Sequence, residues 1–342
     1  MAHSKQWNFY SRIRSAPAII LMLTAAVGLA VGFHKGPYLV VNTIVMGGML
    51  AMVSMGLALV FGVMNIAQFA HGEYFMIGTL VAYYIFPGLH RYAVQHANGT
   101  LAGIAPLIGI FGALFAGVVT GALTEMIIFS GLRRRSLSNW VMNTFLITLG
   151  LSVIMVNSHQ LLFGVNPKGI TRYWSGRPFD IMGLFMSRDR VFALVIAAII
   201  VAAFWAFMKY SETGKAIRCV SQNETGALIV GINLSTIQIV TMSLSCGLAA
   251  VAGASLLFMY PSYPTVGLEP LYMAWFVVIL AGLGNVAGAA ACSFIVALLK
   301  IVTIEYVGMG WDYVFPTAFI TLILIIKPNG LFGSVVRGVH NE

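Results

Sequence analysis

Charged side chains are scarce in this sequence. Asp, Glu, Lys and Arg together make up 8% of its 342 residues, whereas about a quarter of the residues of a soluble globular domain are charged. Polar stretches are also short: none exceeds about 30 residues, which is too few for an independently folded soluble domain. Hydrophobic residues account for 59% of the chain. These proportions exclude an ordinary soluble protein and indicate a single polytopic membrane domain.

Acidic residues, cysteines and catalytic motifs are also rare or missing. The chain has 10 Asp and Glu against 19 Lys and Arg, but the basic residues lie in short clusters beside apolar runs, as membrane topology requires, so we exclude nucleic-acid binding. The three cysteines are too far apart in sequence to suggest a metal site or a disulfide framework. Phosphate-binding glycine loops and His-Glu-x-x-His motifs do not occur. We therefore expect no enzyme activity, no metal and no cofactor.

The apolar runs predict an all-α polytopic membrane protein with about nine or ten transmembrane segments, since about 20 apolar residues cross the hydrocarbon core. The expected spans are 17–33, 39–62, 68–87, 103–129, 139–163, 191–209, 234–260, 286–304 and 311–326. A shorter apolar piece at 271–283 either crosses or re-enters the membrane. We divide the chain into an N-terminal extension with its own span (1–38), a membrane domain (39–333) and a short tail (334–342).

The distribution of Lys and Arg predicts the orientation of these spans. With a cytoplasmic N-terminus, eleven Lys or Arg fall in cytoplasmic segments and seven in external ones. Residues 209–233 are then cytoplasmic, and Asp180 lies outside. The loop 164–190 opposes this orientation, because it would be external although it contains five basic residues.

One stretch places four polar side chains in otherwise apolar sequence: Asn65, Gln68, His71 and Glu73. Glu73 is the only charged residue between Tyr38 and Pro87. A carboxylate at bilayer depth is costly and normally faces a bundle interior or a watery cavity. We therefore interpret these four residues as part of a translocation path or of its support. A structural hydrogen-bond cluster and a loop at the membrane surface are the alternatives.

Within this stretch we expect Glu73 to fix helices beside the path, accepting hydrogen bonds from neighbours such as Gln68 or His71. Two other polar residues of the spans have simpler explanations. Glu125 precedes the Arg133 cluster by about two turns, which predicts a helix end near the headgroups. We expect His159 to be a packed, hydrogen-bonded residue.

Two further stretches interrupt the apolar pattern. Residues 213–230 have the spacing of a short amphipathic helix, and Gly231 resembles a helix stop; an ordinary solvated loop is the alternative. The second stretch, 280–289, is rich in glycine and predicts a broken helix, with Gly282, Gly284 and Gly288 allowing close backbone approach. Together with the stretch at 65–73, it matches the interrupted segments that transporters place at their midplane site, although close packing alone would also explain it.

Four ordered motifs resemble those of a known family. They are Gly56-Leu-Ala-Leu-Val-Phe-Gly-Val-Met-Asn-Ile-Ala-Gln-Phe-Ala-His-Gly-Glu-Tyr-Phe-Met-Ile-Gly78, Gly214-Lys-Ala-Ile-Arg-Cys-Val-Ser-Gln-Asn with Gly231-Ile-Asn, Leu280 to Ala289, and Lys327-Pro-Asn-Gly-Leu-Phe-Gly333. From about residue 47 to 333 the chain is similar to the membrane permeases of branched-chain amino acid ABC importers, a group that includes urea and short-chain amide permeases. It departs from the family at Gly131-Leu-Arg-Arg-Arg, at Asn285-Val-Ala and in its long N-terminal extension.

The resemblance implies an ABC importer permease fold with broken or re-entrant helices in the inner (plasma) membrane. It implies a second homologous permease subunit, two cytoplasmic ATPase subunits and an external solute-binding protein as partners, in contact with membrane lipid, and a small polar solute as cargo. The residues that it assigns to the ATPase-coupling loop are Glu212, Gly214, Lys215, Arg218, Gln222, Asn223 and Gly231. The alternatives are a urea or amide permease and, from another class, an ion-coupled carrier in which Glu73 titrates.

Overall fold

A computed structural model describes residues 38–135, 140–174, 176–181 and 184–333, together with positions 22, 24, 26, 28 and 36. The expected first span lies largely outside this part of the chain, and the expected C-terminal tail lies entirely outside it. The helices are α2 (Tyr38–Met64), α3 (His71–Gln95), α4 (Gly99–Thr124), η1 (Glu125–Phe129, a π-helix), α5 (Ser130–Arg135), α6 (Trp140–Phe163), α7 (Arg188–Tyr210), α8 (Glu212–Gln222), α9 (Glu224–Ile229), α10 (Leu234–Ser255), α11 (Leu268–Ala281), α12 (Val286–Tyr306), η2 (Met309–Trp311, a 3-10 helix) and α13 (Val314–Ile326). Two short antiparallel strands, β1 (Phe179–Ile181) and β2 (Leu184–Met186), form a hairpin with Phe179 opposite Met186.

The expected all-α membrane architecture is confirmed. Among the described residues, seven helical stretches are long and apolar enough to cross a membrane: α2, α4 through η1 into α5, α6, α7, α10, α12, and η2 with α13. The apolar piece expected at 271–283 is the helix α11, which has 14 residues. At 1.5 Å per residue it is about 21 Å long, shorter than the hydrocarbon core of about 30 Å, so it does not cross by itself.

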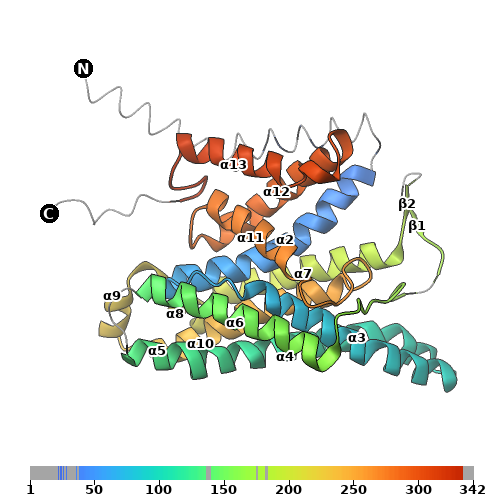
Figure 1. The fold of residues 1–342 in the computed structure, drawn as a ribbon, viewed down its shortest axis with the longest axis horizontal. Coiled ribbons are helices and arrows are strands. Elements are labelled where there is room, and N and C mark those ends of the chain that lie inside the picture. The colour runs from blue at the N-terminus through green and yellow to red at the C-terminus, as the bar shows by residue number, and fades with distance from the viewer. Residues whose placement is uncertain are drawn as a thin grey trace.

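Helices α2 and α10 form the centre of the molecule: in each, 83% of its 18-residue apolar stretch is buried. In Figure 1, α11, α12 and α13 lie on one side of α2, and α3, α4, α6 and α10 lie on the other. Helices α8 and α9 are at the left of this view, and the β1–β2 hairpin is at the right. We call these two extremities the α9 end and the hairpin end.

Glycines bring the central helices into backbone contact. A Cβ atom on Gly78 of α3 would lie 1.9 Å from the Ala250 carbonyl oxygen of α10. On α4, Gly117 and Gly121 are four residues apart and face α10, where added Cβ atoms would lie 2.6 to 2.8 Å from Ala250 and Cys246. Small residues at this spacing allow van der Waals packing and backbone approach between helices in lipid. They explain how α10 lies close to both α3 and α4.

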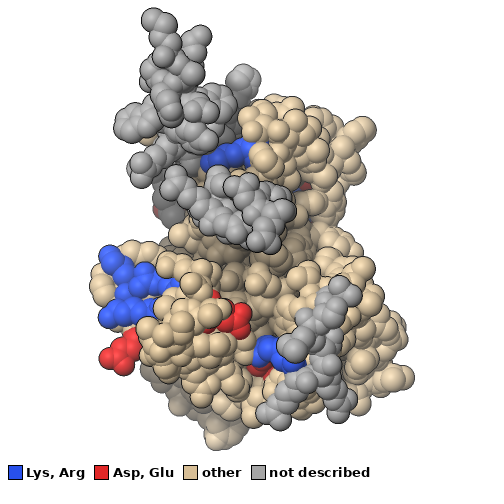
Figure 2. Space-filling model, turned by 90° about the vertical axis from the view of Figure 1, so that its left-hand side faces the viewer, with Lys and Arg blue, Asp and Glu red and all other residues tan. Residues whose placement is uncertain are grey.

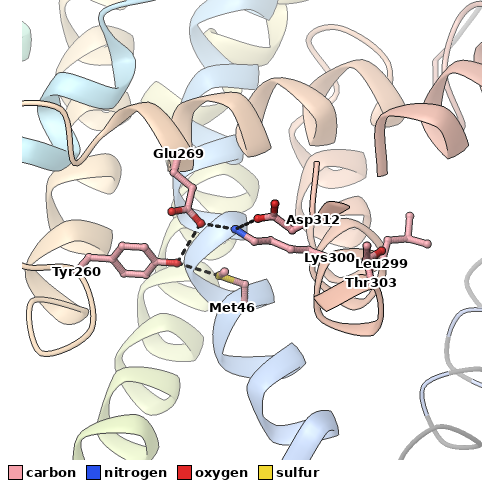
Figure 3. Close-up of polar contacts among 7 residues, drawn as sticks. All are labelled: Met46, Tyr260, Glu269, Leu299, Lys300, Thr303 and Asp312. Carbon is pink, nitrogen blue, oxygen red and sulfur yellow. Dashed lines mark hydrogen bonds and ion pairs between the residues drawn. The ribbon is translucent and has the colours of Figure 1, made fainter. Parts of the chain in front are cut away.

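An ionic cluster joins α11, α12 and the end of η2 (Figure 3). The ammonium group of Lys300 on α12 lies between Glu269 at the start of α11 and Asp312 directly after η2, 3.7 Å from the Asp312 carboxylate. Tyr260 Oη lies 3.5 Å from the Glu269 carboxylate. The Lys300 side chain is 4% exposed, whereas those of Glu269 and Asp312 are 35% and 17% exposed. One buried cation thus holds the ends of three elements together.

Candidate functional site

The helix break predicted around residue 65 is real. Helix α2 ends at Met64, Asn65 has a left-handed backbone (φ 51°), and α3 does not begin until His71. The Asn65 amide donates to the Phe61 carbonyl at 3.0 Å, which closes the last turn of α2. Asn tolerates the left-handed conformation better than most residues with a side chain, so it ends a helix well. Residues 65–70 follow without regular structure.

This segment turns back along α2 toward the hairpin end. His71 Nε2 lies 3.0 Å from the carbonyl oxygen of Val53, which precedes Met64 by eleven residues, or about 16 Å of helix. Gly56 makes room for the imidazole, because a Cβ atom there would lie 3.2 Å from its Cε1 atom. Helix α3 therefore begins beside the middle of α2, and residues 65–70 lie as irregular backbone at the depth of a membrane span.

Helix α6 provides hydrogen-bond partners for this irregular backbone. The Phe69 amide donates to Thr148 Oγ1 at 3.3 Å, and the same hydroxyl lies 3.0 Å from the Ala67 carbonyl as a donor. The Trp140 indole donates to the Met64 carbonyl at 3.0 Å. Irregular backbone is tolerated at membrane depth only where protein or water satisfies it. The hydroxyl and indole groups of α6 meet that requirement here.

Glu73 is fully buried and has one hydrogen bond in the described part of the chain. Ser152 Oγ donates to Glu73 Oε1 at 2.8 Å, while Oε2 has no partner there. The expectation that Gln68 or His71 donates to Glu73 is wrong. Gln68 is directed toward α10, with Nε2 3.9 Å from Cys246 Sγ, and His71 is directed toward α2. Asn65, the fourth predicted residue, is exposed.

Three aromatic rings that were not among the predicted site residues pack together beside the irregular segment, where Phe69 precedes Glu73 by four residues. Phe69 meets Phe145 of α6 edge to face, with centroids 5.0 Å apart, and stacks on Trp275 of α11 at 5.2 Å. All three are partly exposed, and Trp275 Nε1 has no partner among the described residues. The four-residue spacing of Thr148 and Ser152 in an apolar span was the one signal that α6 would face this segment.

His159, another residue of α6, differs from its prediction. Its side chain is 3% exposed as expected for a packed residue, but neither ring nitrogen has a hydrogen-bond partner within the described residues. Glu73, which contacts α6 in the seam between α3 and α6, and His159 on α6 are thus two buried titratable residues with unused hydrogen-bonding capacity among the described residues.

The second predicted helix break is confirmed between α11 and α12. Gly282 and Gly284 have φ of +100° and +82°, a region that favours glycine. The C-terminal motif 327–333 pairs with this turn, because the Leu331 amide donates to the Leu280 carbonyl at 2.7 Å and the Asn285 side chain donates to the Phe332 carbonyl at 2.9 Å. Gly288 packs against Phe332, and an added Cβ atom would be 3.0 Å from Phe332 Cβ.

The two breaks are in direct contact. A Cβ atom on Gly62, near the end of α2, would lie 2.9 Å from the backbone of Gly284. A Cβ atom on Gly72, in the first turn of α3, would lie 2.3 Å from the Gly267 carbonyl, immediately before α11. The irregular segment 65–70 therefore runs beside α11 from one end of that short helix to the other.

At the α9 end, the amphipathic element predicted at 213–230 consists of two helices. Asn223 separates them: its side chain accepts the Gly226 amide at 2.9 Å and so caps α9. Helix α8 buries Ile217 and Val220. Its predicted coupling residues are exposed except Gly214, which is buried because an added Cβ atom would lie 2.4 Å from the Phe207 carbonyl of α7.

The exposed surface of this end is both charged and apolar. The exposed predicted residues are Glu212, Lys215, Arg218, Gln222, Asn223 and Gly231. Beside them, Leu228, Ile229 and Val230 are 54%, 81% and 71% exposed. Figure 2, which views the molecule from this side, shows a group of Lys and Arg side chains with Asp and Glu side chains next to it. A surface of this kind suits a protein partner.

Arg133 connects the α9 end with the irregular segment. Its guanidinium donates to the buried carboxylate of Glu125 in η1 at 2.5 Å, donates to the Gln238 side chain near the start of α10, and lies 5.4 Å from the Trp140 ring centroid. The expectation that Glu125 marks a helix end near the headgroups accounts for neither its burial (1% exposed) nor its ion pair. Because Trp140 binds the Met64 carbonyl, four segments meet around one cation.

Within the described residues, no group of three or more His, Cys, Asp or Glu is arranged to hold a metal ion. The three cysteines, Cys219, Cys246 and Cys292, are free thiols.

Comparisons with known proteins agree on one family. A family model described as the permease component of the branched-chain amino acid transport system matches residues 39–325. The high-affinity branched-chain amino acid transport system permease protein LivH of Salmonella typhimurium is 24% identical over 299 residues, covering 85% of this chain and 94% of the relative. LivH of Escherichia coli K12 is 23% identical, with the same coverage of both chains, and BraD of Pseudomonas aeruginosa is 22% identical, covering 86% of this chain and 94% of BraD. No solved structure matches the chain.

Proposed function

The chain belongs to the family of branched-chain amino acid transport permeases, and from this membership we propose that it is the membrane subunit of an ATP-driven importer for branched-chain amino acids. The observation that carries the proposal is the extent of the match, which covers nearly the whole described membrane domain, from the first residues of α2 to the end of α13. The relatives that match along this length are named for the transport of branched-chain amino acids.

The translocation path of this importer runs beside the irregular segment 65–70 and α11. Discontinuous helices at membrane depth are characteristic of solute sites in transporters, since their free backbone and polar side chains line a cavity. Asn65, Gln68, His71 and Glu73 belong to this path or to its support. Gln68 and His71 support it, because their side chains are directed toward α10 and α2.

The energy enters through separate ATPase subunits at the α9 end. The exposed row Glu212, Lys215 and Arg218 of α8, together with the apolar tip Leu228–Val230, gives such a subunit both charged and apolar contacts. Gly214 acts indirectly, because it seats α8 against α7. A movement of α8 and α9 is transmitted to the start of α10. From there it passes through the hydrogen bond between Gln238 and Arg133. Arg133 lies on the Trp140 ring, and the Trp140 indole holds the Met64 carbonyl at the end of α2.

This arrangement requires the α9 end in the cytoplasm and the hairpin end outside, in the inner membrane. A second permease subunit completes the path, two ATPases drive it, and an external binding protein delivers the solute.

Reconstitution tests the proposal. Proteoliposomes that contain the permease pair and its ATPases, supplied with the binding protein, are expected to accumulate leucine with ATP and to be indifferent to an imposed proton or sodium gradient. Gradient-driven uptake by this chain alone would refute the importer in favour of an ion-coupled carrier. ATP-driven uptake of urea or a short amide, but not of leucine, would refute the substrate class.

A further inference from the structure

Glu73 is an uncompensated buried carboxylate. It is fully buried within the length of a membrane domain, and no Lys, Arg or His of the described residues forms an ion pair with it. Its only described hydrogen bond comes from Ser152, to one of the two carboxylate oxygens. Burying a carboxylate in this way is expensive unless a cation or several donors accompany it. By contrast, the buried Glu125 has Arg133 as its partner. Among the described residues, Glu73 therefore has no cationic hydrogen-bond donor.

The neighbouring groups define which cation would fit. Phe69 precedes Glu73 by four residues, and its ring forms a partly exposed apolar surface with the rings of Phe145 and Trp275. In the same cluster, the Trp275 indole N–H is buried and without a partner in the described part of the chain, so it offers a donor. An indole nitrogen can only donate, whereas the free Glu73 oxygen can accept. The site thus combines an acceptor for an ammonium group, an apolar surface, and a donor for an anion.

From these groups we propose that the seam between α3, α6 and α11 is the solute site, and that it binds a zwitterionic amino acid with an aliphatic side chain. The ammonium group donates to Glu73 Oε2, the aliphatic chain packs on Phe69, Phe145 and Trp275, and the carboxylate accepts the Trp275 indole N–H. Ser152 is a positioning residue, because its hydroxyl holds Oε1 and leaves Oε2 for the solute. This assignment rests on the proposed function and adds to it the chemical groups that recognise the solute.

Helix α6 gives the solute access to this buried carboxylate. Only 11% of the 18-residue apolar stretch of α6 is buried, against 83% of the corresponding stretches of α2 and α10. It meets the irregular segment and α3 through hydroxyl and aromatic contacts of Trp140, Phe145, Thr148, Ser152 and Phe163. A displacement of α6 away from α3 exposes Glu73 without disturbing the packing of α2 against α10.

Direct binding to the permease–ATPase complex tests the assignment. Radiolabelled leucine is added to the purified complex without the binding protein, so that only the permease site is measured. Two unlabelled competitors each retain one charged group: 3-methylbutylamine has the ammonium, and 4-methylpentanoate has the carboxylate. We expect the amine to compete at least tenfold better than the acid. We also expect Glu73→Gln to weaken leucine binding by about tenfold, equivalent to about 1.4 kcal/mol, and to abolish the advantage of the amine.

Matched variants separate recognition from assembly. Glu305→Gln at the end of α12 removes one carboxylate outside the site and is expected to leave binding unchanged. Glu73→Asp keeps the charge and is expected to retain the preference for the amine. Trp275→Phe keeps an aromatic ring, smaller than the indole, but removes the N–H, and it is expected to weaken competition by the acid while sparing the amine. Size-exclusion profiles show whether each complex assembles.

The outcomes distinguish this inference from the proposed function. If the wild-type complex imports leucine with ATP, but Glu73→Gln binds leucine and both competitors as the wild type does, the inference is overturned and the importer remains. Equal competition by the amine and the acid in the wild type overturns it in the same way, as does the absence of measurable leucine binding. A complex that imports no leucine overturns the proposed function itself.

Discussion

Replacing Thr148 by Val is the sharpest test of how the irregular segment is held in place. The change preserves the shape of the side chain but removes the hydroxyl that accepts from the Phe69 amide and donates to the Ala67 carbonyl. Two backbone groups at membrane depth then lose a partner. A hydrogen bond contributes about 1 kcal/mol net to stability, and side-chain hydrogen bonds between membrane helices average about 0.6 kcal/mol. The expected cost is therefore about 1 to 2 kcal/mol.

Because the lost hydrogen bonds hold only residues 65–70, the frequency with which this segment opens is the most sensitive measure of the destabilisation. A loss of about 1 to 2 kcal/mol makes opening of residues 65–70 about 5 to 30 times more frequent, and amide hydrogen exchange in this segment is expected to accelerate by the same factor. Hydrogen–deuterium exchange with mass spectrometry on the purified protein measures it.

Thr144→Val is the matched control. Thr144 is also fully buried and lies one turn earlier on α6, but among the described residues its hydroxyl donates only to the Trp140 and Val141 carbonyls of its own helix. It is expected to leave exchange in 65–70 unchanged. Equal effects of the two variants, or no effect of Thr148→Val, would refute the idea that α6 satisfies the irregular backbone.

Four further predictions concern other parts of the molecule. Arg218→Glu reverses one exposed charge of α8, and it is expected to abolish ATPase stimulation by the binding protein while the melting temperature stays within about 1 °C of the wild type, since exposed substitutions rarely affect stability. Gly214→Leu is expected to abolish stimulation and also to lower the melting temperature, because the new side chain meets the backbone of α7. Lys300→Met leaves Glu269 and Asp312 without their cation and is expected to cost about 1 to 3 kcal/mol in thermal unfolding, less than a fully buried pair because both acids are partly exposed. For topology, in a chain without native cysteines, an impermeant thiol reagent on intact cells is expected to label a cysteine at position 180 but not one at position 215.

Each of these has a contradicting result. Normal stimulation in Arg218→Glu would remove α8 from the ATPase interface, and a stable, well-coupled Gly214→Leu would mean that α8 need not lie against α7. For Lys300→Met, the double variant with Glu269→Gln is expected to recover part of the loss. An unchanged melting temperature in the single variant would show that the ionic cluster contributes nothing. Labelling at position 215 and not at 180 would invert the orientation.

Hydropathy predicted the positions of the membrane helices closely. The expected span at 39–62 is α2 at Tyr38–Met64, and the span at 191–209 is α7 at Arg188–Tyr210. The largest errors arose at polar or helix-breaking residues. The span expected to end at Pro87 continues to Gln95, with Pro87 inside α3, and α3 is not among the seven helical stretches of the described residues that are long and apolar enough to cross a membrane. The helix expected over 213–230 breaks at Asn223, whose side chain caps the next helix.

The composition of the candidate site was harder to predict. Asn65, Gln68, His71 and Glu73 stood out because polar residues are rare in apolar sequence, but nothing local indicated that 65–70 folds back along α2. The partners of this segment come from distant parts of the chain: Ser152 follows Glu73 by 79 residues, and Trp275 lies on α11. Such pairings depend on tertiary packing, which periodicity does not contain.

The glycine contacts at the two ends of α11 have a mechanical consequence. Gly62 against Gly284 and Gly72 against Gly267 are contacts of main chain on main chain, with no side chain between them that could rotate to absorb a displacement. We therefore expect residues 62–72 and α11 to move together as one rigid body. During a transport cycle, spin labels on these two segments would keep a constant separation, while a pair across the α3–α6 seam would change theirs. In the proposed solute site, residues 62–72 and α11 form the fixed wall and α6 the movable one, so we expect this site to open from the α6 side.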